Sequence, residues 1–238
     1  MNFRMIFKSI GTVICVEAAC MIPSLIVALI YNEGDAPAFI VSILAAGITG
    51  FVLMCIKSKT SLIYTRDGFA IAALGWLLIT AFGALPFILS GAIPSSVDAF
   101  FESASGFSTT GASILKDVEA APKGILFWRS FTHWIGGMGV LILMIALIPS
   151  VKPSTLHILK AESPGPSPGK FVPKIGQSTK ILYLIYAALT AIQVIILAIG
   201  GMPLYDNLVH TFGTAGTGGF SSRNASVGAY GSLYTIWL

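Results

Sequence analysis

The sequence predicts an all-α membrane protein, and three observations support this fold class. Hydrophobic residues make up 55% of the chain and charged residues 10%, and the mean hydropathy is +0.85. Several apolar runs approach the roughly 20 residues that a helix needs to cross a bilayer. A short segment rich in threonine and glycine occurs twice between such runs. This composition excludes an ordinary soluble domain, so backbone groups must be satisfied within helices.

The predicted spans follow one another along the chain. They lie at Ile10–Tyr31, Ala38–Ile56, Phe69–Leu89, Ile125–Ile148 and Ile181–Ile199, and a sixth begins near Tyr230. The first follows Arg4 and Lys8 as a signal peptide would, but it is long and lacks a convincing cleavage site, so we expect a retained span. The three cysteines lie inside apolar runs, which favours packing over disulfides or metal binding.

The charges predict how the chain crosses the membrane. With the N-terminus in the cytoplasm, alternation places these basic residues inside: Arg4, Lys8, Lys57, Lys59, Arg66, Lys152, Lys160, Lys170, Lys174 and Lys180. The acids Glu33, Asp35, Asp98, Glu102, Asp117, Glu119 and Asp206 fall outside. The positive-inside rule supports this orientation in the cytoplasmic (inner) membrane and explains the basic excess without nucleic acid. Negative potential at the outer mouth suits a cation path.

The repeated segment carries the functional prediction. Asp98–Ser113 and Asp206–Ser221 align without a gap, which pairs Thr109 with Thr217 and Gly111 with Gly219. Each segment is too short to span, and both fall on the outer side. We interpret each as a re-entrant pore helix followed by a strand of an ion-selectivity filter. The alternative is that small residues only permit close helix packing. Repetition in register favours the filter.

Backbone carbonyls can replace the water shell of K⁺ while binding it weakly enough for release. We expect Thr109, Thr110 and Gly111 to form one filter strand and Thr217, Gly218 and Gly219 the other. Asp98 and Asp206 stand where N-cap carboxylates would begin the two pore helices. The partially negative C-terminal end of each helix would then face the cation. No triad, paired-carboxylate site or metal-ligand spacing fits this topology, so we predict no enzyme and no organic cofactor.

These segments divide the chain into four parts. Residues 1–60 form a transmembrane hairpin, 66–150 a first span–pore helix–span unit, 151–176 a cytoplasmic linker and 177–238 a second unit whose last span is incomplete. Prolines and glycines in Glu162–Lys170 prevent helix in the linker. The two units have the same orientation, so the repeat is parallel.

Several polar residues inside apolar runs need an interpretation. For Glu17 we favour hydrogen-bonded packing over ion coupling. Arg129 is expected to extend toward the outer interface, and for His133 packing is favoured over proton coupling. Glu102 and His210 occupy equivalent places on the two short helices, which predicts polar contacts behind the filter. The tryptophans Trp76, Trp128 and Trp134 are expected at the interface or in packing.

Seven motifs together resemble the Trk/Ktr/HKT superfamily of K⁺ transporters, most closely its bacterial TrkH/TrkG branch. They are Arg66–Phe69, Leu85–Phe87, Asp98–Ser103, Thr109–Ala112, Trp134–Gly139, Ala161–Pro166 and Gly218–Ser221. The resemblance implies K⁺ uptake through a central pore surrounded by four such units, of which this chain holds two. It also implies that Gly111 favours K⁺, whereas serine at that position goes with Na⁺ permeation.

The resemblance further implies partners: the lipid bilayer, a second copy in a homodimer, and a cytoplasmic nucleotide-binding subunit of the TrkA type. Downhill conduction and Na⁺- or H⁺-coupled symport both stay open. Because two strands cannot close a fourfold carbonyl cage, we expect the chain to be the N-terminal half of a longer protein or to need a second half. The alternative is a non-conducting assembly or regulatory protein with a half-pore fold.

Overall fold

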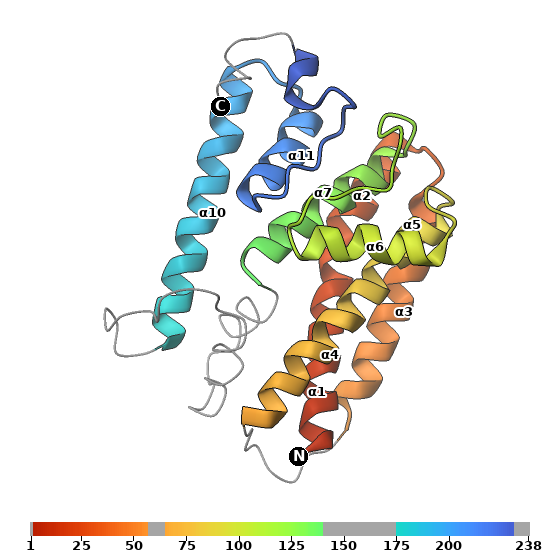
Figure 1. The fold of residues 1–238 in the computed structure, drawn as a ribbon, viewed down its shortest axis with the longest axis vertical. Helices are drawn as coiled ribbons and strands as arrows, with labels where there is room; N and C mark the ends of the chain where they lie inside the picture. Colours follow the sequence, from red (N-terminus) through yellow and green to blue (C-terminus); the bar gives the residue numbers. More distant parts are fainter. Residues whose placement is uncertain (1, 57–64, 140–174, 231–238) are drawn as a thin grey trace.

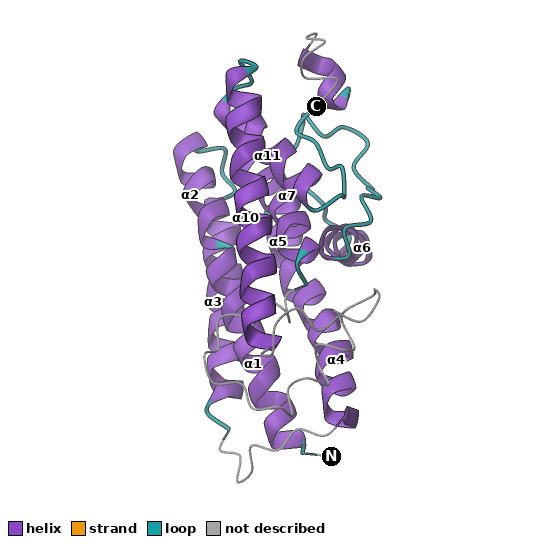
Figure 2. Cartoon of the chain, turned by 90° about the vertical axis from the view of Figure 1, so that its left-hand side faces the viewer, coloured by secondary structure: helices purple, strands orange, loops and turns teal. Residues whose placement is uncertain are grey.

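The computed structural model describes residues 2–56, 65–139 and 175–230, and these residues are helical apart from turns and connecting loops (Figures 1 and 2). Four helical stretches are long and apolar enough to cross a membrane: Phe3–Tyr31, Ala36–Met54, Arg66–Leu89 and Lys180–Ile199. The predicted all-α membrane fold is confirmed at this level. The linker from Glu162 to Lys170 and the sixth predicted span lie outside the described residues.

The N-terminal hairpin consists of α1 (Phe3–Cys20), α2 (Ile22–Tyr31) and α3 (Ala36–Met54). The first span is interrupted at Met21, because Pro23 in the first turn of α2 has no N–H to continue the helix. Helices α1 and α3 approach closely through glycines. A Cβ built on Gly11 would lie 2.6 Å from Gly50 O, so larger side chains there would separate the helices.

The next four helices are α4 (Thr65–Gly83), α5 (Leu85–Leu89), α6 (Ser96–Phe107) and α7 (Lys123–Gly137). Helix α6 lies across the long helices in Figure 1 and packs on both α4 and α7. Trp128 of α7 is fully buried and donates from Nε1 to Gly83 O at 2.9 Å, which confirms its predicted packing role.

The prediction of one span over Ile125–Ile148 is wrong as a continuous helix. Helix α7 ends at Gly137, and the chain turns at Gly139, whose φ is +67°. This left-handed conformation stops an α-helix and is accessible to glycine at little cost. Residues 140–148 lie outside the described part.

The last elements are α10 (Ile175–Ile199), α11 (Leu204–Ala215) and the 3₁₀ helix η2 (Ser226–Tyr230). Within Lys180–Ile199 few residues of α10 are buried, as expected of a helix facing lipid or another protein segment. It is tied to its neighbours by side chains: Trp134 Nε1 donates to Thr190 Oγ1 at 3.0 Å, and Asn207 Nδ2 donates to Val194 O at 2.9 Å. These bonds join α10 to α7 and α11.

The hairpin also completes the start of α7, whose own N-cap, Pro122, offers no side-chain acceptor. Glu33 Oε2 accepts from Lys123 N at 2.6 Å, and the Asp35 carboxylate lies against the backbone of Gly124. Burial raises the pKa of Asp35 above its usual range. The loop between α2 and α3 thus supplies Glu33 as an acceptor for an orphan donor of α7, whereas neither Asp35 oxygen has a hydrogen-bond partner within the described residues.

Glu17, buried within the first span, lies beside Gly83 and Ser103. Its Oε1 is 3.1 Å from a Cβ built on Gly83, and neither carboxylate oxygen has a hydrogen-bond partner within the described residues. The carboxyl group is therefore in a packed position behind α6, but the predicted hydrogen bond is not found there.

Candidate functional site

The two short helices of the repeat are equivalent element by element. Helices α6 and α11 each contain 12 residues, and their ends at Phe107 and Ala215 differ by the same 108 positions that relate the sequence repeat. The main chain leaves both in the same way. Ser108 N donates to Ala104 O at 2.9 Å, and Gly216 N donates to Phe212 O at 3.0 Å. The register predicted from the sequence is the register of the fold.

The segments that follow the helices share their backbone conformation as well. Thr109 and Thr217 have φ values of +56° and +59°, and Gly111 and Gly219 have +76° and +82°. Left-handed threonine is uncommon, so its occurrence at two equivalent positions supports a structural repeat. The next bonds also repeat: Thr110 N donates to Ser105 O, and Gly218 N to Gly213 O, both at 2.9 Å.

The two segments meet through main-chain atoms. A Cβ on Gly111 would overlap Gly218 O, and a Cβ on Gly218 would overlap the His133 ring. A Cβ on Gly219, by contrast, would have no atom of the other described residues within 4 Å, apart from its two neighbours in the chain. All six predicted filter residues are exposed or half-buried. The structure therefore brings both predicted strands together, and K⁺ binding by them stays a prediction.

The prediction of Asp98 and Asp206 as N-caps is wrong, because each helix begins three residues earlier. Ser95 caps α6 and accepts from Asp98 N at 3.4 Å, whereas Pro203 stands at the N-cap of α11. Asp98 and Asp206 lie in the first turns of the two helices. A carboxylate there still complements the positive helix end. Asp206 is used differently again, because Ser222 Oγ donates to its Oδ1 at 2.6 Å.

Each segment is anchored by the residue at the predicted equivalent position of its helix, but with different chemistry. In the first, the fully buried Glu102 accepts from Ser113 Oγ at 2.9 Å and from Ile114 N at 2.8 Å. In the second, His210 Nε2 lies 3.5 Å from Ser221 Oγ. The predicted polar contacts behind the segments are confirmed for both residues.

Arg129 does not extend to an interface, which corrects the sequence prediction. Its side chain is 3% exposed and Nε donates to Glu102 Oε1 at 2.5 Å. Sequence reasoning treated Glu102 and Arg129 separately because they are 27 residues apart. The available signal was the cost of an unpaired arginine inside an apolar run, which calls for a buried carboxylate.

His133 is packed, as predicted. Its ring stacks on Phe220 with centroids 3.9 Å apart, and the two ring planes are inclined by 21°. Neither ring nitrogen has a hydrogen-bond partner within the described residues.

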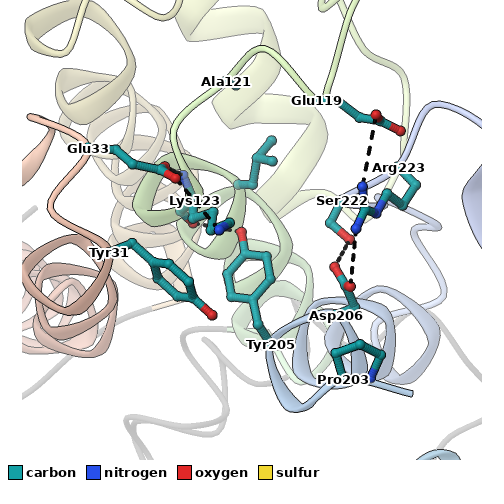
Figure 3. A pocket seen from close by; sticks show the side chains of 11 residues that line it. Tyr31, Glu33, Glu119, Ala121, Lys123, Pro203, Tyr205, Asp206, Ser222 and Arg223 are labelled. Carbon is teal, nitrogen blue, oxygen red and sulfur yellow. Dashed lines mark hydrogen bonds and ion pairs between the residues drawn. The ribbon is translucent and has the colours of Figure 1, made fainter. Parts of the chain in front are cut away.

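A cavity of about 290 Å³ lies where α2, α7, α11 and the loops beside them meet (Figure 3). Tyr31 of the hairpin contacts Tyr205 of α11 edge to face, with ring centroids 5.3 Å apart. Tyr205 donates to Lys123 O at 2.8 Å. Charged side chains around the cavity pair with one another, including Lys123 with Glu33 at 3.7 Å and Arg223 with Asp206 at 3.8 Å. The cavity is therefore a structural junction.

A second contact between the units is made by Asn224, which follows the second segment. Its Oδ1 accepts from Val118 N and its Nδ2 donates to Asp117 Oδ1, both at 2.8 Å. The side-chain hydrogen bond from Asn224 lowers the pKa of Asp117. Sequence analysis did not identify this contact, because it joins residues more than 100 positions apart.

The family model described as TrkH, cation transport protein, matches residues 36–238. The chain belongs to the TrkH family. It is 35% identical over 235 residues to the Trk system potassium uptake protein TrkH of Halomonas elongata, and 38% identical over 235 residues to that of Salmonella typhimurium. Either alignment covers 98% of this chain and 49% of the relative.

The fold agrees with the family assignment. The crystal structure of the potassium transporter TrkH from Vibrio parahaemolyticus matches with a TM-score of 0.81 at 32% identity, over 100% of this chain and 49% of that one. This TrkH-family chain thus spans about half the length of the relatives it matches. It is a multi-pass membrane protein by its family and its apolar helices.

Proposed function

We propose that the chain supplies two of the filter strands of a K⁺-uptake pore, in which the ion is held by backbone carbonyls of Thr109, Thr110, Gly111, Thr217, Gly218 and Gly219. The observation that carries the proposal is the repeated backbone at the point where the two segments meet. In an extended strand, successive carbonyls point to opposite sides. Thr109 and Gly111 both have left-handed φ values, which depart from an extended strand, and we propose that this departure turns carbonyls of the segment toward one side. Clustered carbonyls of this kind suit a dehydrated K⁺ ion.

The proposed architecture is a hairpin followed by parallel span–pore helix–span units, divided as residues 1–60, 66–150, 151–176 and 177–238. The C-terminal ends of α6 and α11 precede the two strands, so their partial negative charge would favour a cation. The N-terminus would lie in the cytoplasm of a cell whose inner membrane holds the protein, as the distribution of lysine and arginine favours. K⁺ is then the transported substrate.

Family resemblance extends the proposal to partners. The complete transporter would form a homodimer in the bilayer and bind a cytoplasmic nucleotide-binding subunit of the TrkA type. Uptake would be either downhill conduction or symport coupled to Na⁺ or H⁺. The relatives named potassium uptake proteins support K⁺ as the substrate.

A second candidate applies to the 238-residue chain by itself, since it spans about half the length of its relatives. Two strands leave the carbonyl cage open, so residues 1–238 alone would insert into the membrane without conducting. We therefore propose comparing two samples in cells that lack K⁺ uptake: residues 1–238, and the longest natural reading frame that contains them.

The readout is Rb⁺ uptake, with insertion measured on the same membranes. Saturable uptake by the longer frame and none by residues 1–238 is the expected result. No uptake by a well-inserted longer frame would overturn the proposed function. Uptake by residues 1–238 would instead mean that copies assemble into a complete pore. In the longer frame, Gly111→Ser is expected to let Na⁺ compete with Rb⁺.

A further inference from the structure

We propose that Arg129, working with Glu102, is a positioning residue for the second filter strand as well as the first, and so a determinant of ion selectivity. The inference rests on the proposed function and assigns one buried ion pair to both strands. The pair itself belongs to the first unit, because Glu102 lies on α6 and Arg129 on α7.

Glu102 links the ion pair to the first strand. Glu102 is fully buried and holds three donors: Ser113 Oγ, Ile114 N and Arg129 Nε. A buried carboxylate with three donors is confined to one position, and it fixes the main chain shortly after Gly111. Arg129 contributes the charge that makes this burial tolerable.

Arg129 also contacts the second strand. Its Nη1 donates to Ser221 O at 3.4 Å, and its guanidinium carbon lies 3.5 Å from the centroid of the Phe220 ring. A guanidinium stacked on an aromatic face is favourable, particularly where water is excluded. The side chain therefore contacts the two residues that directly follow Gly219.

Phe220 lies between two side chains of α7. His133 stacks on the ring at a centroid distance of 3.9 Å, while Arg129 lies over its centre at 3.5 Å. Two groups so close to one centroid must occupy opposite faces, so the ring is enclosed between them. His133 also fills the space beside Gly218. One face of α7 thus holds residues 218–221, while its arginine holds Glu102.

The chemistry of arginine matters for this role. Lysine would keep the positive charge beside Glu102, but it has no planar fork to stack on Phe220 while pairing with a carboxylate. Arg129→Lys therefore keeps the positive charge beside Glu102 while it removes the contact that positions the second strand.

The test uses the longest natural reading frame, expressed in cells that lack K⁺ uptake. For each variant we would measure the amount of inserted protein, the K⁺ concentration that halves Rb⁺ uptake, and the competition of Na⁺ with Rb⁺. Arg129→Lys is expected to insert normally and to lose about tenfold in K⁺ over Na⁺ preference. Phe220→Leu, which leaves the ion pair intact, is expected to change selectivity in the same direction. Arg223→Lys is the matched control, since Arg223 likewise pairs with carboxylates, Glu119 and Asp206, but is 45% exposed at the junction cavity.

Wild-type selectivity in Arg129→Lys would overturn the inference, because charge alone would then suffice. If Arg129→Lys fails to insert, Phe220→Leu decides, and unchanged selectivity in that variant overturns the inference. Restoration of wild-type selectivity by the neutral pair Glu102→Gln with Arg129→Gln would also overturn it. A wild-type protein that inserts and takes up no Rb⁺ would refute the proposed function separately.

Discussion

The segments after α6 and α11 have the same main chain and different supports. Both leave a 12-residue helix, both place a left-handed threonine two residues beyond it, and both return a serine to the helix residue 11 positions earlier. The first is held by a buried carboxylate with an arginine partner. The second is held by an imidazole at longer range and by groups from α7. Backbone geometry in this fold therefore tolerates a change in the chemistry that supports it.

The largest expected difference between the segments comes from their glycines. Gly111→Ala must adopt φ near +76° and also place its Cβ on Gly218 O, whereas Gly219→Ala has a similar φ of +82° and its Cβ meets none of the other described residues within 4 Å. Each left-handed alanine costs about 1 kcal/mol, and overpacking adds roughly 1–3 kcal/mol to Gly111→Ala alone.

The two variants would be compared by the melting temperature of the purified full-length protein and by the competition of Na⁺ with Rb⁺ uptake. Gly111→Ala is expected to unfold at lower temperature and to discriminate less than Gly219→Ala. Equal effects from both variants would show that the segments do not meet as described.

A smaller difference is expected between the two anchoring serines. Both accept from the main-chain N–H two residues later, at 3.1 Å for Ser113 and 2.9 Å for Ser221. Only Ser113 donates to a carboxylate, so Ser113→Ala is expected to cost about 2 kcal/mol and Ser221→Ala less than about 1 kcal/mol. Denaturation midpoints of the two variants would test the order, and a reversed order would contradict the assignment of Glu102 as the stronger anchor.

The smallest expected effect lies at the contact between the units. Asn224→Ala removes both bonds to the loop of the first unit, and a decrease of about 2 °C in melting temperature is expected. The substitution also removes the bond that lowers the pKa of Asp117. A lowered folded-state pKa adds stability above the unfolded pKa, and that stability is lost as the pH falls through the folded value.

Melting temperatures at neutral and acidic pH would measure this contribution. The wild type is expected to lose the part of its advantage over Asn224→Ala that comes from Asp117 on acidification below the ordinary aspartate range, while the bond from Val118 N remains. An advantage that is independent of pH would mean that Asp117 is not part of the contact.

Much of this site was predictable because it depends on local order along the chain. The alignment of Thr109 with Thr217 and of Gly111 with Gly219 predicted equivalent turns, and the helices end where that register requires. Glu102 and His210 were identified as equivalent for the same reason. Local patterns carry this information because the main-chain bonds involved span only a few residues.

The parts that were missed depend on distant residues or on small local energies. No periodicity relates Arg129 to Glu102, or Asn224 to Asp117, since those pairs form only after the helices pack. The helix starts were misplaced because Ser95 and Asp98 are both acceptable caps by type, and the position of the first turn decides between them. The end of α7 was missed because apolar residues continue beyond Gly137 while the backbone turns.

Gly111 and Gly218 meet without side chains, and this limits how evolution can change the protein. Substitution elsewhere can be graded, from carboxylate to imidazole or from long to short. At this seam every replacement adds atoms where none fit. The two copies of the segment are therefore freer to diverge in the residues that brace them than in the residues where their main chains touch. Glu102 and His210 already differ in this chain, and Gly218 stands where the first copy has Thr110, so the close contact is made by two non-equivalent positions.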